Sequence, residues 1–437
     1  HRDLHSFPTR RSSDLPVHFE FFEPDGTLAV SQIVGLRVQG NSSRTLPRKP
    51  LRVYARDEYG PEWLEHEFFT GLRAHGKPAE VMDRFKRVNL RSESDQVWST
   101  YFRDVFAQRL VAHLGFEVQT YRPVVHFLNG EYWGLLNMQE PYDEYFVAEH
   151  YGLDPDEVII LDGGWGPSVH VGEPSDALHY RMLRDYAATN DLSVGLHYDY
   201  LNTQMVVTNF INYQVAHIYM NATDWGDNGN NIRFWRKRTA NFEPNTPTGH
   251  DGRWRWMMYD ATATFSAPEA NTLARCMGTN PPLVLFTRLL ENREFRHQVI
   301  NTFADKMNTT FLPEWVKQVS TNVYEELLPE LPEHNARWNG NISPMSTVFA
   351  DERPGYMRQH LADVFNLSGT ARVTLNVADP RQGKVQINSL LLDEHTIGIR
   401  GAPYPWSGTY FKDVPITIRA LPRSEERRVG KECRSRW

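Results

Sequence analysis

The sequence predicts an α+β protein with a strand-rich N-terminal part, a helical C-terminal part and a small β module at the end. Apolar and polar residues alternate in early segments such as Ile33–Gln39, and this period of two is typical of half-buried strands. Residues 282–367 contain longer segments separated by Pro-, Gly- and Asn-rich joints, which indicates helices. The alternation returns over residues 373–422, so a further strand-rich unit is expected there.

Strands are expected first where β-branched and aromatic residues stand between turn residues. Asn129-Gly130 separates two apolar runs, and this dipeptide is the strongest short signal for a β-hairpin. The hairpin therefore joins a strand before residue 129 to one after residue 130. The expected strands of this part are Pro16–Phe22, Ile33–Gln39, Leu51–Tyr54, Pro123–Leu128 and Glu131–Asn137.

Helices are expected where apolar residues share one helical face. The segment Tyr101–Leu114 has apolar residues at helical spacing and is followed by Gly115, a common helix stop. The segment Thr203–Tyr219 is apolar enough to be a core helix. The other expected helices are Leu178–Thr189, Pro282–Glu291, Phe295–Asn308, Pro313–Leu328 and Arg353–Phe365.

The two ends, residues 1–15 and 423–437, look like translations of opposite strands of one synthetic sequencing adapter. The natural piece would then be residues 16–422, an internal fragment of a longer reading frame. Within it we expect one domain over residues 16–367 and a truncated β-rich module over residues 370–422. Without the two ends, 38 basic and 49 acidic residues remain of 47 and 54, which changes the net charge from −7 to −11.

The composition excludes several classes of protein. The net negative charge argues against nonspecific nucleic-acid binding, which needs Lys and Arg to neutralise phosphates. One cysteine, Cys276, would remain in the natural piece, which excludes a disulfide framework. No run of 18 apolar residues occurs, so no transmembrane segment is expected in this fragment.

Two carboxylates bracket one predicted hairpin. The segments Asn231–Arg238 and Arg253–Tyr259 read as strands, and the loop between them is rich in Pro, Gly, Asn and Thr. Asp224 and Asn230 precede the first strand, and Asp260 follows the second. In an antiparallel pair those two places are neighbours, with the strands roughly 5 Å apart. Carboxylate and amide oxygens suit Mg²⁺ or Mn²⁺, so the spacing suggests a metal site at the open end of this hairpin.

A second candidate site is the polar turn between the strands that end at Gln39 and begin at Leu51. It carries small hydroxyl residues and basic residues, a layout that can close over phosphates. A plain hairpin with a basic surface is the alternative, because a short Gly/Ser turn is a weak motif. Glu140 follows the last predicted strand of this part, and either it is a solvated strand end or it pairs with an active-site Lys as in kinases.

Five blocks of this sequence together resemble the CotH kinase family, named for a bacterial spore-coat protein. The resemblance covers residues 16–367 approximately. Members of the family are similar to atypical protein kinases, which transfer the γ-phosphate of ATP to Ser residues. The blocks are GLRVQGNSSRTLPRKPLRVYA (35–55), FRDVFAQRLVAHLG (102–115), YRPVVHFLNGEYWGLLNMQE (121–140), NATDWGDNGNNIRFW (221–235) and WRWMMYDATATF (254–265).

The resemblance implies an atypical protein-kinase-like domain and a role for each candidate residue. Asp224 matches the catalytic aspartate, which orients the substrate hydroxyl or accepts its proton. Asp260 matches the metal-binding aspartate, and Asn231, or less closely Asn230, matches the metal-binding asparagine. The nucleotide loop corresponds to Ser42, Ser43, Arg44 and Lys49, with Lys49 at the phosphates. The implied cofactors are ATP with Mg²⁺ or Mn²⁺, and the implied partner is a protein substrate with exposed serines.

The sequence departs from the family in the stretch that carries the metal aspartate. Many members read Asp-x-Asp-x-x-Phe-Gly, whereas this chain has Thr262 for the second Asp and Ser266 for the Gly. Three functions therefore remain: an active Ser/Thr kinase, a degenerate kinase fold with an assembly role at the cell or spore surface, and a glycoside hydrolase that uses Asp224 and Asp260 as paired acids. The C-terminal strands resemble β modules of large secreted or surface bacterial proteins, which favours an exported protein.

Overall fold

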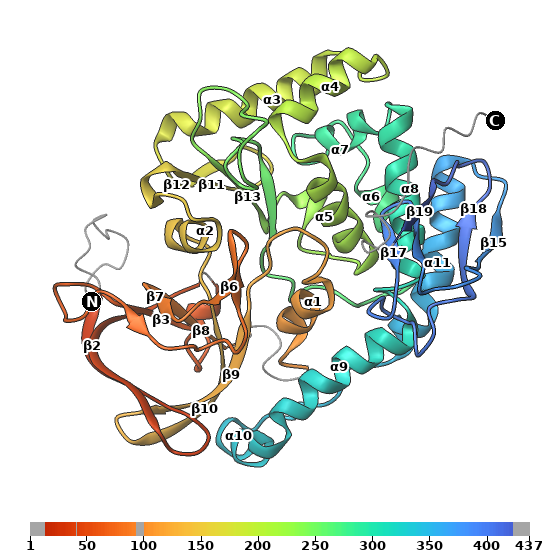
Figure 1. Ribbon diagram of the computed structural model, residues 1–437. Coiled ribbons are helices and arrows are strands. Elements are labelled where there is room, and N and C mark those ends of the chain that lie inside the picture. The colour runs from red at the N-terminus through yellow and green to blue at the C-terminus, as the bar shows by residue number, and fades with distance from the viewer. Residues whose placement is uncertain (1–13, 41, 93–99, 423–437) are drawn as a thin grey trace.

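The computed structural model describes residues 14–40, 42–92 and 100–422, and it has two lobes followed by C-terminal strands. Figure 1 shows the strand-rich lobe at the lower left, the helical lobe at the top and centre, and the last strands at the right. The mixture of helices and strands confirms the α+β class. The two ends expected to be foreign lie outside the described residues, apart from Asp14 and Leu15.

The N-terminal lobe is built on one six-stranded antiparallel sheet. Its turn at Asn129-Gly130 has positive φ at both residues, 51° and 79°, which confirms the predicted hairpin. The strands lie in the order β1-β2-β3-β8-β10-β9. Their bounds are β1 Leu15–Phe22, β2 Leu28–Val38, β3 Leu51–Tyr54, β8 Arg87–Arg91, β10 Glu131–Gln139 and β9 Tyr121–Leu128.

The two faces of this sheet differ in polarity. One face is apolar and packs on Phe68, Phe69 and Phe85, which come from the segment between β3 and β8. That segment forms two small ribbons, one of β4 Leu64–Glu65 with β7 Arg84–Phe85 and one of β5 Arg73–Ala74 with β6 Lys77–Val81. The other face is polar and looks toward helix α1, Arg103–Val111, because Gln139 of β10 donates a hydrogen bond to Asp104 of that helix. The polar face therefore lies on the side of the second lobe.

The second lobe contains a four-stranded sheet in the order β12-β11-β13-β14. The predicted central hairpin is confirmed: β13, Ile232–Lys237, pairs antiparallel with β14, Arg255–Met258. Strand β11, Val158–Asp162, lies on the other side of β13, and β12, Ser168–Val171, forms the edge. Large aromatic residues of the hairpin, including Trp235, Trp254 and Trp256, are buried and build the core.

Helices pack around this sheet, and most of them lie where the sequence predicts helices. Among the described residues, four short helices were not predicted: α2, α4, α6 and α10. Helix α2 carries an ordinary start signal, because Asp143 accepts hydrogen bonds from the backbone of Tyr145 and Phe146. The bounds are α2 Glu144–Tyr151, α3 Ala177–Thr189, α4 Gly195–Gln204, α5 Val207–Tyr219, α6 Thr272–Arg275, α7 Val284–Leu289, α8 Arg293–Met307, α9 Pro313–Leu327, α10 Leu331–Trp338 and α11 Val348–Phe365.

Strands follow α11, as the alternation predicts, but they do not form a core of their own. Their buried side chains, such as Trp406 and Tyr410, belong to the same hydrophobic cluster as the helical lobe. Asp305 of α8 accepts hydrogen bonds from Ser389 and Tyr410, which fixes these strands to the helices. The bounds are β15 Thr370–Leu375, β16 Gly383–Ile387, β17 Leu390–Leu392, β18 Trp406–Phe411 and β19 Ile418–Pro422.

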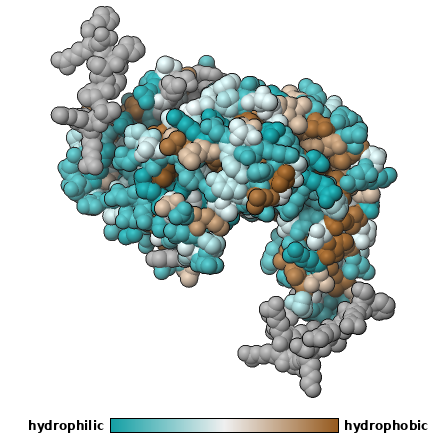
Figure 2. All heavy atoms as spheres, turned by 90° about the horizontal axis from the view of Figure 1, so that it is seen from above, coloured by the Kyte–Doolittle hydropathy of each residue, from teal (hydrophilic) through white to brown (hydrophobic). Residues whose placement is uncertain are grey.

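The surface is mostly hydrophilic in the view of Figure 2, and hydrophobic residues gather on the part at the right, where Figure 1 has the C-terminal strands. Ile418 and Leu421 of β19 are among the exposed apolar side chains. Among the described residues no helix is long and apolar enough to cross a membrane.

Candidate functional site

The open end of the β13–β14 hairpin brings two of the predicted residues together. Ile232 pairs with Met258 at the last position of the ladder, so Asn231 and Asp260 stand just beyond it. Both residues have a φ of 50°, in the left-handed region that Asn and Asp tolerate better than most side chains. The strand ends therefore turn sharply at both positions.

The segment with Asp224 lies beside the segment that follows Asp260. Helix α5 ends at Tyr219, and the chain then runs along residues 260–266. The backbone N–H of Thr223 donates to the carbonyl of Ala263 at 2.9 Å, and that of Phe265 donates to the carbonyl of Met220 at 2.7 Å. These bonds hold the two carboxylate-bearing segments in a fixed register.

Three asparagine side chains surround the Asp224 carboxylate. Asn228 and Asn230 donate to its Oδ1 at 2.9 and 2.8 Å, and Asn231 donates to its Oδ2 at 3.1 Å. Asn230 and Asn231 use their NH₂ groups on Asp224, so their amide oxygens remain as acceptors toward other partners, whereas the Asn228 oxygen accepts from the backbone of Asn230. Asn228 was not predicted, although its place four residues after Asp224 suits a loop that folds back on the carboxylate.

Asp260 is held by a hydroxyl and a guanidinium. Thr262 Oγ1 donates to its Oδ1 at 2.7 Å, and Arg91 Nη2 approaches the same oxygen at 3.3 Å. Burial raises the pKa of Asp260, but the Arg91 charge and the Thr262 hydrogen bond outweigh it, so the pKa lies below its usual range. The Asp260 side chain is still 33% exposed, so one side of the carboxylate is accessible.

The open end of the hairpin, with residues 220–231 and 260–266, is called the hairpin edge. Arg91 links the N-terminal sheet to this edge and was not predicted. It is the last residue of β8, and its Nη1 lies 3.5 Å from Asp104 Oδ2 of α1. Asp104 is fully buried, and it accepts hydrogen bonds from Gln108 and Gln139 and from the backbone of Ala261. Arg91 is thus shared between a fixed carboxylate on α1 and the exposed carboxylate of Asp260.

A second arginine that was not predicted, Arg353, is buried beneath the edge. Arg353 of α11 is 0% exposed and donates to the carbonyls of Ile218 and Tyr219 at the end of α5. It also donates to the carbonyls of Pro268 and Ala270, which follow the Asp260 segment. One side chain therefore satisfies carbonyls from both segments that carry the carboxylates, including carbonyls at the end of a helix.

A comparison with protein-family models matches residues 36–363 to the model described as CotH kinase protein. The match covers most of the chain. The chain belongs to the CotH kinase family. A comparison with curated proteins gives no match. The family is kinase-like, which confirms the resemblance stated from the sequence.

The arrangement around Arg91 matches the parts of a protein kinase. Kinases pair a Lys on a central strand of the N-terminal sheet with a Glu on the next helix, and a metal-binding Asp lies nearby. In this CotH-family chain Arg91 stands on such a strand, Asp104 on the helix that follows, and Asp260 beside them. In its placement on a strand and the next helix, the Arg91–Asp104 pair is comparable to the Lys–Glu pair of kinases.

The predicted nucleotide loop lies at the same end of the sheet as Arg91, because Leu51 at its exit pairs with Leu90. Ser42–Thr45 form a 3₁₀ helix, and Ser43 is buried. Lys49 is half-buried, and its Nζ donates to the carbonyl of Arg44 at 2.5 Å. The loop thus holds Lys49 by one of its own carbonyls, and a phosphate role for Ser42, Ser43, Arg44 and Lys49 remains a prediction.

Glu140 does not pair with Lys49, which corrects one of the two interpretations offered for this residue. The Glu140 side chain is buried, and its Oε1 contacts His150 Nε2 at 3.0 Å. Strand β10 ends at Gln139, so Glu140 has already left the sheet and faces α2. It is not a solvated strand end either, since it belongs to the buried connection between the lobes.

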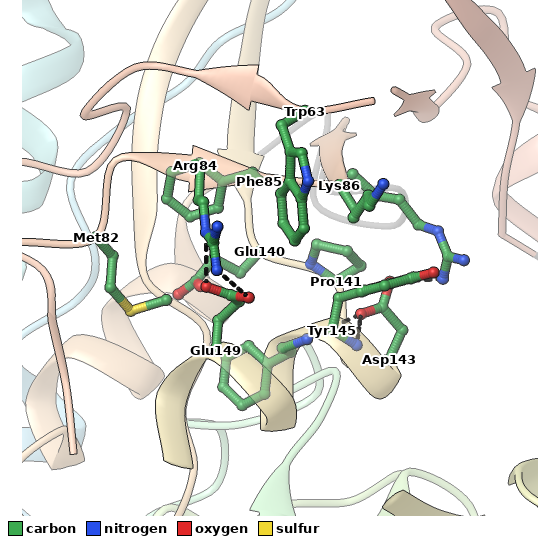
Figure 3. A pocket seen from close by; sticks show the side chains of 12 residues that line it. Trp63, Met82, Arg84, Phe85, Lys86, Glu140, Pro141, Asp143, Tyr145 and Glu149 are labelled. Carbon is green, nitrogen blue, oxygen red and sulfur yellow. Dashed lines mark hydrogen bonds and ion pairs between the residues drawn. The ribbon is translucent and has the colours of Figure 1, made fainter. Parts of the chain in front are cut away.

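A pocket lies beside this connection, and Figure 3 shows one of its basic residues, Arg84, paired with Glu149. Arg84 makes two hydrogen bonds to Glu149, both 3.0 Å long. Arg87 bonds Asp143 at 2.8 Å, and Lys86, which also lies over the ring of Trp63, bonds Glu62 at 2.9 Å. The charges of this pocket are therefore neutralised within the protein.

The donor set at the hairpin edge fits a divalent cation that arrives with a phosphate ligand. Mg²⁺ commonly uses one or two carboxylates, several waters and substrate phosphates. Asp260 offers an accessible carboxylate, and Asn230 and Asn231 keep their amide oxygens. No group of three or more His, Cys, Asp or Glu side chains suited to a metal occurs among the described residues, so the protein alone does not form a closed cage.

Proposed function

We propose that the chain transfers the γ-phosphate of ATP to serine hydroxyls of a secreted, surface or coat protein. The observation that supports this most is the hairpin edge, where Asp224 and Asp260 stand on adjacent backbone segments, each with defined partners. Family membership supports a kinase-like enzyme, and the Arg91–Asp104 pair supplies the remaining part of a kinase centre.

In the proposed reaction the serine oxygen forms a bond to the γ-phosphorus while the bond to the β–γ bridging oxygen breaks, which gives phosphoserine and ADP. Asp224 orients the serine hydroxyl and takes its proton. The asparagine amides hold the Asp224 carboxylate in place. Asp260 and Asn231 would hold the divalent cation, and the cation would supply charge neutralisation on the phosphates.

Mass spectrometry of the purified protein after incubation with ATP and Mn²⁺ tests this proposal. The parent chain should gain phosphate. Asp260→Ala should lower the rate of phosphate incorporation by roughly 10²-fold or more, because the cation that binds the phosphates loses a protein ligand. Asp199→Ala is the control, because Asp199 is an exposed acid on α4, outside the hairpin edge. Phosphate incorporation by Asp260→Ala at the parent rate would contradict the proposal.

A degenerate kinase fold with an assembly role is the second candidate, and the contacts of Asp260 favour it. Thr262 stands where many relatives have a second Asp, and its hydroxyl occupies one oxygen of Asp260 together with Arg91. A lost carboxylate ligand weakens metal binding. Thermal unfolding with ATP, with and without Mn²⁺, separates the candidates: an unchanged melting temperature supports the assembly role.

No described contact of Asp224 or Asp260 favours the third function, a glycoside hydrolase. It needs a sugar cleft lined by aromatic side chains, whereas the tryptophans of the hairpin are buried in the core.

A further inference from the structure

An exposed tryptophan stands beside the segment that carries Asp224, and the proposed chemistry gives it no role. Trp165 lies in the loop between β11 and β12 and is 52% exposed. By contrast, Trp235, Trp254 and Trp256 of the hairpin are buried in the core. Packing of the core therefore does not explain the place of Trp165.

The indole of Trp165 is held from two sides. Its Nε1 donates to the backbone carbonyl of Asn228 at 2.9 Å. Its five-membered ring lies against Gly229, because a Cβ built on Gly229 would stand 2.4 Å from Trp165 Cδ1. The loop is bound to the same residue, since the backbone N–H of Gly164 donates to the carbonyl of Gly229 at 2.9 Å. An aromatic ring fixed in this way offers contact area at a low cost in conformational entropy.

One residue connects this indole to the Asp224 carboxylate. Asn228 accepts from the indole through its backbone carbonyl and donates to Asp224 Oδ1 through its side-chain amide, at 2.9 Å in both bonds. Asp224 is exposed, so a substrate hydroxyl can reach it. In an extended peptide, residues two positions apart point to the same side and lie roughly 6.8 Å apart. That spacing suits a peptide whose serine meets Asp224 and whose second residue before or after the serine meets Trp165.

The groups around the ring favour an apolar side chain as its partner. The indole N–H is already used on Asn228, so the exposed part of the ring is apolar surface. Arg184 of α3 donates to the backbone carbonyls of Gly164 at 3.5 Å and of Trp165 at 3.2 Å, so its positive charge lies beside this loop. A Lys or Arg side chain placed on the ring would face that charge. An aromatic side chain would instead bury apolar area and pair with the indole edge-to-face or offset.

We propose that Trp165 determines which serines the protein phosphorylates, by packing on an aromatic side chain two residues from the target serine. The proposal rests on the proposed kinase function, which brings the serine hydroxyl to Asp224. The ring contacts the peptide and takes no part in the transfer of the phosphate. It therefore acts on kcat/KM for the peptide and leaves the KM for ATP unchanged.

Synthetic peptides with one central serine, incubated with the full chain, ATP and Mn²⁺, test this role. The second residue before or after the serine is Phe, Lys, Glu or Ala. At one of these two positions, Phe should raise kcat/KM about tenfold over Ala, and Lys should not. Trp165→Ala should remove the preference for Phe, whereas Trp165→Phe should keep most of it because it keeps a ring. Fluorescence anisotropy of the same peptides, carrying a label, measures binding independently of transfer.

Leu196→Ala is the matched control, because Leu196 is an exposed apolar residue of α4, outside the hairpin edge. It should keep the preference for Phe, and circular dichroism should show that each variant is folded. An unchanged preference in Trp165→Ala, a parent preference for Lys or for neither residue, or a raised KM for ATP with the peptide preference intact would each overturn the role of Trp165.

The failure of this role and the failure of the proposed function give different results. Transfer that depends on Asp260 but not on Trp165 would leave the proposed function standing and overturn the role of the ring. Binding of the Phe peptide that depends on Trp165, without any transfer, would support the contact with the ring and overturn the proposed function.

Discussion

The hairpin edge and the 39–50 loop are both expected to meet the phosphate donor, yet they are held in different ways. At the edge, two segments far apart in sequence are joined by backbone hydrogen bonds and share the buried Arg353. In the loop, Lys49 bonds a carbonyl of the loop itself. Its neighbour Arg48 is the residue that reaches other elements, through the carbonyl of Ser92 and the ring of His334.

This difference separates a preorganised part of the site from an adaptable part. Groups that stabilise developing charge work best when their positions are fixed before the ligand binds. Asp224 and Asp260 meet that condition, because their partners are already in place. A loop that closes over phosphates contributes more to nucleotide binding than to the chemical step. Substitutions in the loop should therefore change kcat less than substitutions at the hairpin edge do.

Arg353→Met is expected to show the largest effect on stability. The change removes donors from the carbonyls at the end of α5 and from those of Pro268 and Ala270, in the core. Unsatisfied buried polar groups cost about 1–3 kcal/mol each, so the free energy of unfolding should fall by roughly 3–5 kcal/mol. Urea unfolding followed by fluorescence measures it.

Arg358→Met, on the same helix, is the control for this change. Arg358 donates one hydrogen bond, to the carbonyl of Pro354 within α11, so the cost should stay near 1 kcal/mol. Equal losses for the two variants would show that the helix tolerates either arginine and that Arg353 does not hold the edge. The edge would then be no more fixed than the loop.

A pH-dependent loss of stability is the next expected effect, and it arises at His217 below the edge. His217 is buried and stacks on Trp225, the residue after Asp224, with ring centroids 4.5 Å apart. Burial lowers the pKa of His217 to about 4, whereas an unfolded chain has a histidine pKa near 6.5. The unfolded state therefore binds more protons between these values, and stability falls as the pH falls from 6.5 toward 4.

His217→Phe removes this titration and keeps a ring against Trp225. The parent chain should lose roughly 1–3 kcal/mol more than the variant between pH 6.5 and 4, as measured by urea unfolding at each pH. His18→Gln is the control, since His18 is an exposed residue of β1. A parallel pH dependence of parent and His217→Phe would contradict the assignment to this ring.

How far each part could be predicted follows from the sequence distance between the partners. The hairpin was predictable because its strands are close in sequence and Asp224, Asn231 and Asp260 stand at their ends. The contacts of Arg91 with Asp260 and of Arg353 with Tyr219 were not predictable, because they span 169 and 134 residues and an isolated Arg has no periodic pattern. Glu140 was placed in an interaction that does not form, since strand alternation does not show where a chain leaves its sheet.

Lys49→Gln is expected to show the smallest effect, and it tests the adaptable side of the comparison. Lys49 is half-buried and bonded within its own loop, so the loss of its charge should raise the KM for ATP about two- to threefold and leave kcat unchanged. Steady-state kinetics with varied ATP measures both constants, and Lys412→Gln, an exposed lysine of the C-terminal region, is the control. A fall in kcat of tenfold or more would place Lys49 at the reacting phosphate. The loop would then have to close onto the edge during the reaction, and the two regions would act as one preorganised site.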